Sequence, residues 1–202
     1  MIQLKLGEDV SQLPNITIEV VTDGNIEQCR ELCNELMAFQ KSMATMAPEA
    51  FDTMNFDTRM KRSYENALES QVIVVKDNGD PVGYVFSTID RIDPSKRAFP
   101  AWAPVEGKSD VLGFYPDWEQ IPSKMGCLNN LYLREPYRDL GLGSKLFQMS
   151  MDWLESFADV EVIFIYVSNG NDAALQFYLQ KGFTFSHDVF GGFIKAVYKV
   201  RA

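Results

Sequence analysis

The hydrophobic and polar positions in the first third of the chain follow two different periods. Residues 16–20 alternate apolar with polar side chains, which predicts a half-buried strand. Apolar residues at helical spacing over 26–42 predict an amphipathic helix. A shorter helix is expected around 60–67, after a connector at 43–57 that is apolar enough to border a pocket but has no clear period.

The middle of the chain predicts a hairpin followed by a long irregular segment. Apolar runs at 71–76 and 82–89 flank Asn78-Gly79, which is a strong short-range signal for two antiparallel strands. Residues 91–126 carry five of the nine prolines, so we expect a long inserted loop before the next strand. Loops of this length are usually functional or disordered, and the aromatic residues here favour an ordered flap or a subunit contact.

The rest of the chain predicts alternating strands and helices. The expected elements are a strand at 127–133, a helix at 141–157, a buried strand at 162–167, a helix at 171–181 and a hairpin of strands at 183–189 and 193–200. Gly182 stands where helices commonly end in a left-handed residue. A strand-helix-strand crossover is therefore expected over 127–167.

Length and composition indicate one ordinary globular domain. The 202 residues suit a single domain over 1–202, with a regular core at about 16–200. Hydrophobic residues make up 46% and charged residues 23%, which is typical of soluble proteins. No apolar run reaches the roughly 20 residues of a membrane span, and the acidic start does not resemble a signal peptide. We therefore expect a cytoplasmic protein without a membrane partner.

Charge and cysteine usage argue against two kinds of site. The net charge of −9 argues against nucleic-acid binding, because phosphate backbones attract basic surfaces. It would favour a cationic small molecule, although acidity also serves solubility alone. Cys29 and Cys33 lie one helical turn apart and Cys127 stands on an expected strand, so no disulfide framework is predicted. No second ligand pair follows them, and no metal site is expected.

A glycine-containing turn carries the most informative chemistry. Residues 138–144 read Arg-Asp-Leu-Gly-Leu-Gly-Ser between an expected strand and an expected helix. The first turn of a helix has unpaired backbone N–H groups and partial positive charge, so a pyrophosphate can bind there. Gly141 and Gly143 would allow its close approach. Taken alone, the pattern fits a tight structural turn equally well.

Two spaced motifs together resemble the GNAT acetyltransferases. One is the family's acyl-CoA motif, Gln/Arg-x-x-Gly-x-Gly/Ala, and the other is its later helical motif, in the same order and with a strand between them. The matching residues are Arg138, Gly141 and Gly143 in the first and Asn171, Ala174, Tyr178, Gly182 and Phe183 in the second. The resemblance covers roughly 16–200. It implies an α/β (α+β) fold with a strongly bent, mostly antiparallel mixed sheet, flanked by helices and splayed at an acetyl-CoA cleft.

The resemblance also implies a cofactor site for acetyl-CoA, without a metal. The pyrophosphate would bind at the turn, where the residues concerned are Arg138, Asp139, Gly141, Leu142, Gly143 and Ser144. The pantetheine arm would pair with main-chain groups of Leu131 and Leu133 like another strand. Asn171 would hydrogen-bond that arm or cap its own helix.

Catalytic roles follow from the same resemblance. The Tyr178 hydroxyl would meet the CoA sulfur and protonate the departing thiolate, unless Tyr178 is only a buried helix residue. A strand amide near Leu131 is the candidate donor to the oxyanion of the tetrahedral intermediate. Nothing in the sequence pairs with Cys127 as a nucleophile, so direct attack by the amine is expected.

The sequence does not identify the general base. Some family members carry a glutamate on the strand before the glycine turn, but residues 127–130 contain no carboxylate. Asn129 could hold a water or the substrate and Glu119 could reach the site, although both are also ordinary positions. Candidates for the acceptor wall, each of which also suits a structural role, are Tyr115, Trp118 and His187.

We therefore expect an N-acetyltransferase that transfers acetyl from acetyl-CoA to an amine of a small molecule, amino acid or peptide in a ternary complex. The alternative is a non-catalytic acetyl-CoA-binding sensor that keeps the cleft but has lost the acceptor chemistry, consistent with the missing strand carboxylate. A homodimer is compatible with the long loop.

Overall fold

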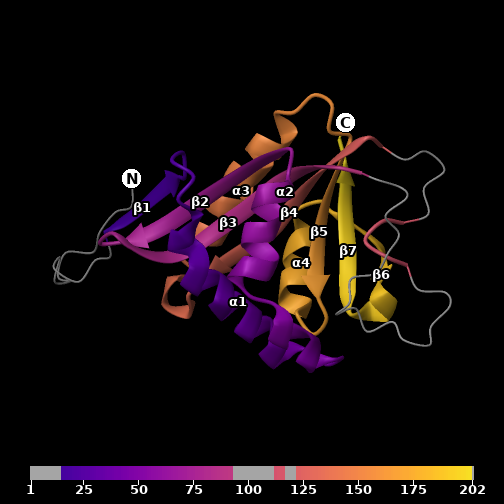
Figure 1. The fold of residues 1–202 in the computed structure, drawn as a ribbon, viewed down its shortest axis with the longest axis horizontal. Helices are drawn as coiled ribbons and strands as arrows, with labels where there is room; N and C mark the ends of the chain where they lie inside the picture. Colours follow the sequence, from indigo (N-terminus) through magenta and orange to yellow (C-terminus); the bar gives the residue numbers. More distant parts are fainter. Residues whose placement is uncertain (1–14, 93–111, 117–121, 202) are drawn as a thin grey trace.

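One seven-stranded sheet organises the protein. The computed structural model describes residues 15–92, 112–116 and 122–201. The strand order is β1-β2-β3-β4-β5-β7-β6, and neighbouring strands are antiparallel except for the parallel pair β4 and β5 (Figure 1). The strands are β1 Ile16–Val20, β2 Glu69–Asp77, β3 Asp80–Arg91, β4 Lys124–Leu133, β5 Val162–Ser168, β6 Thr184–Val189 and β7 Ile194–Val200.

Helices cover both faces of the sheet (Figure 1). The α-helices are α1 Arg30–Met43, α2 Arg62–Asn66, α3 Leu142–Glu155 and α4 Asp172–Gln180. The shorter turns are the 3-10 turns Ile26–Cys29, Pro48–Thr53, Glu135–Tyr137 and Phe190–Gly192 and the π-helical turn η4, Phe56–Lys61.

Alternation along the strands divides the apolar residues into two cores. Tyr84 and Phe86 of β3 face α1 and form part of what we call the first core. Val85 and Ile89 point to the opposite face and pack with residues of α3 and α4 in the second core. This period of two is the reason the sheet carries a hydrophobic cluster on each side.

The expected elements are present, with adjusted bounds. Asn78 and Gly79 have φ of 50° and 92°, the left-handed pair that a tight hairpin turn requires. The helix expected around 60–67 is instead the turn η4 running into the short α2. The loop expected at 91–126 is shorter at both ends, since Arg91 ends β3 and Lys124 begins β4.

The expected role of the long loop lies largely outside the described residues. Most of the loop falls in 93–111 and 117–121, so its role as a flap or a dimer contact stays a prediction. Among the residues that the structure describes, no helix has the length and apolar character needed to cross a membrane.

The sheet opens between β4 and β5. The two strands pair only where Gly126 to Leu128 lie beside Ile163 to Ile165. On the other side of β4, Phe86 of β3 opposes Asn130 whereas Ser87 opposes Leu128. Asn129 is therefore the extra residue of a β-bulge, and bulges bend a strand and re-aim its side chains.

Candidate active site

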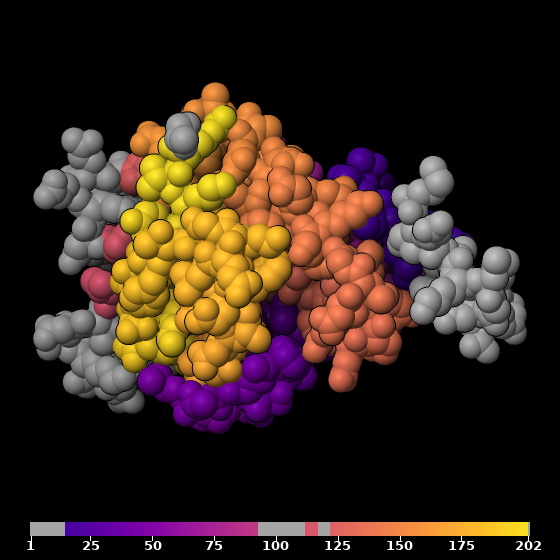
Figure 2. Space-filling model, turned by 180° about the vertical axis from the view of Figure 1, so that it is seen from behind, coloured from indigo at the N-terminus to yellow at the C-terminus, as the bar shows by residue number. Residues whose placement is uncertain are grey.

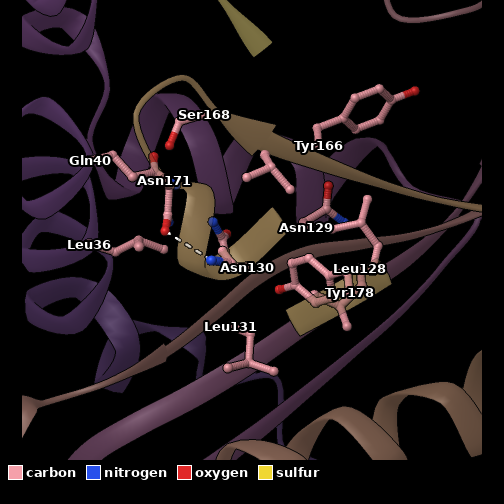
Figure 3. Close-up of a pocket in the computed structure, with 13 residues that line it drawn as sticks. Leu36, Gln40, Leu128, Asn129, Asn130, Leu131, Tyr166, Ser168, Asn171 and Tyr178 are labelled. Carbon is pink, nitrogen blue, oxygen red and sulfur yellow. Dashed lines mark hydrogen bonds between the residues drawn. The ribbon is translucent and has the colours of Figure 1, made fainter. Parts of the chain in front are cut away.

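A pocket occupies the opening between β4 and β5. It holds about 390 Å³ of empty space, part of it open to solvent. Its wall comes from α1, β4, β5 and α4, and the lining residues are Leu36, Gln40, Leu128, Asn129, Asn130, Leu131, Ile165, Tyr166, Val167, Ser168, Asn171, Ala174 and Tyr178 (Figure 3). From behind, the surface is hollowed between the salmon residues near the glycine turn and the orange residues of α4 (Figure 2).

The end of β4 turns main-chain groups toward this opening. The Arg134 N–H donates to the Val82 carbonyl at 3.0 Å, which makes this a hydrogen-bonded pair of the β3–β4 ladder. Leu131 and Leu133 oppose Val85 and Gly83. Because hydrogen-bonded and non-hydrogen-bonded pairs alternate in an antiparallel ladder, Leu131 and Leu133 direct their backbone groups away from β3. They therefore lie where a ligand could pair with the strand.

The glycine turn forms a cradle of unpaired amides at the start of α3. Gly141 is the N-cap residue with φ of 76°, and no side chain caps the helix. The first backbone bond of the helix runs from Lys145 N–H to the Gly141 carbonyl at 3.1 Å. The preceding amides, from 142 to 144, have no hydrogen-bond partner among the described residues. Such amides and the helix dipole favour an anion.

Space above the cradle is open. A Cβ built on Gly141 would meet nothing within 4 Å, and one on Gly143 would meet only Leu133 Cδ1 at 3.7 Å. Asp139 has φ of 60°, so the turn reverses direction through two left-handed residues before the helix begins. Ser144 is exposed and Leu142 partly buried. The local chain therefore leaves the amides accessible.

Arg138 braces this turn. Its Nε donates to the Leu133 carbonyl at 3.0 Å, and its guanidinium lies 5.1 Å from the ring centre of Phe39 and 5.9 Å from that of Tyr132. The side chain thus fixes the turn against β4 and α1. The contact also takes up the Leu133 carbonyl and leaves the Leu133 N–H for a ligand.

Asn171 caps α4, as one of the two readings of the sequence predicted. Its Oδ1 accepts a hydrogen bond from the Ala174 N–H at 3.2 Å (Figure 3). Asn171 also lines the pocket. Asn carries a separate amide donor group, so the cap leaves the Asn171 Nδ2 for a ligand in the pocket.

Tyr178 presents its hydroxyl to the pocket from α4 (Figure 3). Its side chain is 7% exposed, and its ring packs beside Phe147, Phe177 and Phe183. Burial, with a smaller effect of the Cys127 thiol, raises the pKa of Tyr178 well above its usual 10. Among the described residues nothing hydrogen-bonds the hydroxyl, which is therefore a neutral, uncommitted proton donor.

Asn129 links the pocket to a carboxylate that the sequence did not reveal. The Asn129 Nδ2 donates to Thr88 Oγ1 at 2.8 Å, and Thr88 Oγ1 donates to Asp90 Oδ2 at 2.6 Å. Burial raises the pKa of Asp90, whose charge acts on the Cys127 thiol and the Tyr166 hydroxyl. The polar break after an apolar run at 82–89 was the only sequence signal for it.

Cys127 is fully buried and unsuited to nucleophilic attack. Burial and the nearby Asp90 raise its pKa, so the thiol stays neutral. A neutral thiol is a poor nucleophile. Cys127 is therefore no candidate for a covalent intermediate.

The three candidates for the acceptor wall have separate outcomes. His187 is 7% exposed, and its Nδ1 and Nε2 lie 2.8 and 2.9 Å from Ser186 Oγ and the Gly113 carbonyl oxygen. The Nε2 contact ties β6 to the segment 112–116, whereas the Nδ1 contact stays within β6. Tyr115 packs partly buried against the first core and its charge acts on Tyr166, but neither Tyr115 nor His187 lines the pocket. Trp118 lies outside the described residues.

Three residues that line the pocket were not singled out by the sequence. Leu36 and Gln40 of α1 and Tyr166 of β5 line the pocket, and the Tyr166 hydroxyl donates to the Phe114 carbonyl at 2.8 Å. Within the described ranges no group of three or more histidine, cysteine, aspartate or glutamate side chains is placed to hold a metal ion.

Comparisons with known proteins show the family of the chain. Residues 36–183 match the model of the Acetyltransferase (GNAT) family. A probable N-acetyltransferase of Drosophila melanogaster, san, is 36% identical over 59 residues, which are 29% of this chain and 29% of that protein. The chain thus aligns with less than a third of this relative's length.

Solved structures share the fold. PaiA N-acetyltransferase from Thermoplasma acidophilum in complex with coenzyme A superposes with a TM-score of 0.58 at 15% identity, over 92% of this chain and 99% of that one. Arabidopsis thaliana Naa50 in complex with the bisubstrate analogue CoA-Ac-MVNAL gives 0.54 at 15% identity, over 91% and 97%. At such low identity the likeness concerns the fold alone, and it confirms the expected architecture. Because the family model covers most of the sequence, the chain belongs to the GNAT family of acetyltransferases.

Proposed function

We propose that this GNAT protein transfers the acetyl group of acetyl-CoA to a primary amine by direct attack in a ternary complex. The observation that carries the proposal is the opening between β4 and β5. There Leu131, whose backbone groups are free, and Tyr178 line one pocket, and β4 leads from this pocket to the amide cradle at the start of α3. The family's use of acetyl-CoA supports the choice of donor.

The residues present fit acetyl-CoA. The unpaired amides at 142–144 would hold its pyrophosphate, and the open space at Gly141 leaves room for it. Backbone groups of Leu131 and Leu133 would pair with the pantetheine arm as an added strand would. The Asn171 amide group would complete that pairing from α4. Acetyl-CoA supplies an activated acyl carbon with a thiol leaving group.

The chain's own groups would manage the protons and the oxyanion. The Leu131 N–H, which points away from β3, is the proposed donor to the oxyanion that forms when the amine nitrogen attacks the acyl carbon. Tyr178 then gives its proton to the sulfur as the carbon–sulfur bond breaks. The attacking nitrogen loses its remaining extra proton as it becomes an amide, and this proton restores the Tyr178 hydroxyl through solvent. The products are the acetylated amine and a free thiol.

Asp90 is the proposed final acceptor of the proton that the ammonium form of the substrate must lose. Its raised pKa suits a base, and its hydrogen bond to Thr88 connects it to Asn129 in the pocket wall. Because the Asn129 amide does not carry protons, a water held at Asn129 would pass the proton from the substrate to Asp90. The groups that face it electrostatically, the Cys127 thiol and the Tyr166 hydroxyl, are both held neutral by burial. One proton thus leaves the substrate on the acceptor side and one reaches the sulfur from Tyr178.

A sensor without activity is the other candidate, and it was favoured by the absence of a carboxylate on β4. The Asp90 carboxylate on β3 weakens that argument, because it supplies a base from the neighbouring strand.

Incubation of the purified protein with acetyl-CoA and a panel of amines, with free thiol measured against time, tests the proposal. We expect thiol release that depends on the amine. Release no greater than the background hydrolysis for every amine, combined with measurable acetyl-CoA binding, would favour the sensor.

A further inference from the structure

The pocket has walls on both faces of the sheet. Residues directly opposite each other on paired strands point to the same face. Asn130 opposes Phe86 of β3, and Ser168 opposes Ile194 of β7, where both partners belong to the first core. Asn130 and Ser168 thus face α1, whereas Tyr178 packs in the second core together with α3. Acetyl-CoA would therefore reach the pocket from the second core, and the acceptor would approach past Asn130 and Ser168.

Ser168 carries a hydroxyl that the chain leaves without a partner. The residue is 6% exposed and lines the pocket at the end of β5 (Figure 3). Its hydroxyl oxygen has no hydrogen-bond partner. Buried polar groups are normally hydrogen-bonded, so each exception requires an explanation. A polar atom of a ligand bound in the pocket would supply the missing partner.

Two side-chain amides lie in the same wall. Asn130 is 6% exposed, and Gln40 follows Leu36 by four residues on one face of α1. Both amides line the pocket, and neither forms a side-chain hydrogen bond with the described residues (Figure 3). Each of these amides can donate and accept. Together with the Ser168 hydroxyl, they offer uncommitted donors and acceptors to a neutral polar group.

The lining of the pocket carries no charge among the described residues. The cations just after β4 lie outside this lining and have other partners, since Arg134 binds Glu35 and Arg138 donates to the Leu133 carbonyl. Moving an ionised group from water to a wall without a counter-charge is costly. A carboxylate or a second ammonium group on the acceptor would therefore bind poorly here.

We infer that Ser168, Asn130 and Gln40 form a subsite for a neutral amide group of the acceptor. The acceptor is then an amine with an amide group beside its amino carbon, as in an amino-acid amide or a peptide. A free amino acid carries a carboxylate at this position, and a plain alkylamine would leave the Ser168 hydroxyl unpaired. The inference rests on the proposed function, because it assigns a substrate class to that same reaction.

Binding of the expected products tests the subsite without relying on turnover. Saturation-transfer NMR titrations in saturating CoA would compare N-acetylated alanine, leucine and phenylalanine, each as the carboxamide and as the free acid. Acetylation removes the titration of the amino group from the comparison. We expect the carboxamides to bind roughly 10-fold more tightly or better, because only the acid brings an unpaired charge into the pocket. Acetylated dipeptide amides should bind more tightly still if the acceptor is a peptide, and no more tightly if it is an amino-acid amide.

Two variants remove the proposed partners of the amide group. Ser168→Ala deletes only the hydroxyl, and Asn130→Leu replaces the amide by an apolar group of similar size. Each should weaken carboxamide binding about 2- to 10-fold, the range for one neutral hydrogen bond, and leave the binding of acids nearly unchanged. Ser42→Ala is the matched control, since Ser42 is an exposed residue of α1 outside the pocket lining. Ser168→Ala should unfold at no lower temperature than the wild type, because the lost hydroxyl has no partner.

Thiol release from acetyl-CoA with the parent amino-acid amides, measured in parallel, reports on the transferase alone. Preferential binding of carboxamides without thiol release would retain the subsite and refute the proposed reaction. Thiol release combined with equal binding of carboxamides and acids would overturn the subsite. No binding of either product, or an unchanged preference in both Ser168→Ala and Asn130→Leu, would overturn it as well.

Discussion

Replacement of Tyr178 by Phe removes one hydroxyl and keeps the ring. The ring is enclosed by Phe147, Phe177 and Phe183, with centroid separations of 6.1, 5.3 and 6.4 Å. The hydroxyl has no hydrogen-bond partner among the described residues, so its loss should change the free energy of unfolding by less than about 1 kcal/mol. Tyr178→Phe therefore isolates the chemical role of the hydroxyl.

The expected loss is in turnover. A positioned general acid contributes about 10²-fold or more, which corresponds to roughly 3 kcal/mol of transition-state stabilisation. Acetyl-CoA affinity should stay within a few-fold, because the pyrophosphate cradle and β4 are unchanged. Burial raises the pKa of Tyr178 above 10, so the hydroxyl stays protonated and active as an acid up to at least that pH. The wild type should show no alkaline loss of kcat from this group below about pH 10.

Thiol release under saturating acetyl-CoA and amine measures kcat, and calorimetry on the same preparations measures acetyl-CoA affinity. Tyr137→Phe is the matched control, since the Tyr137 hydroxyl donates to Asp77 at 2.7 Å and does not line the pocket. It should retain wild-type turnover. A Tyr178→Phe enzyme that turns over like the wild type would return Tyr178 to a purely structural role.

Three further outcomes are expected. Gly143→Trp should abolish acetyl-CoA binding by calorimetry with an unchanged far-UV spectrum, because its Cβ position is uncrowded but the indole would fill the cradle; unchanged affinity would remove the turn from the site. Asp90→Asn should lower kcat about 10²-fold. The wild type should lose activity as pH falls through the raised pKa of Asp90, and the variant should lack this loss. A variant with the pH profile of the wild type would exclude Asp90 as the base. Asn169→Ala breaks hydrogen bonds to Thr45, Met46 and Phe193 and should cost about 2–4 kcal/mol in urea unfolding, far more than Asn66→Ala on the surface.

Local sequence patterns, which depend only on neighbouring residues, predicted most of the fold. The Asn78-Gly79 turn and the alternation on either side of it determine β2 and β3 locally, and Gly182, with φ of 88°, follows α4 as expected. The glycine turn and Tyr178 could be predicted as site residues because each belongs to a motif of fixed spacing on one element, and their roles stay predictions. Such features depend on neighbours in the sequence.

The residues that the sequence did not reveal depend on pairing between distant segments. Asp90 reaches the pocket wall only because β3 and β4 pair in a register shifted by the bulge at Asn129. The alternation of 82–89 predicts the strand but not that shift.

The proposed reaction site lies where hydrogen bonding between β4 and β5 stops. β4 pairs with β3 along its length but with β5 over only three positions, so the backbone of Leu131 has no neighbouring strand on its open side. Buried backbone groups need hydrogen-bond partners, and in this gap water or an extended ligand must supply them. The bulge at Asn129 lies at the same level and turns its amide toward Thr88 and Asp90. The end of β4–β5 pairing thus leaves the edge proposed to bind acetyl-CoA, and the bulge in the β3–β4 ladder connects the same region to the Asp90 carboxylate. In the proposed reaction, Asp90 would take the place of the strand glutamate of some relatives.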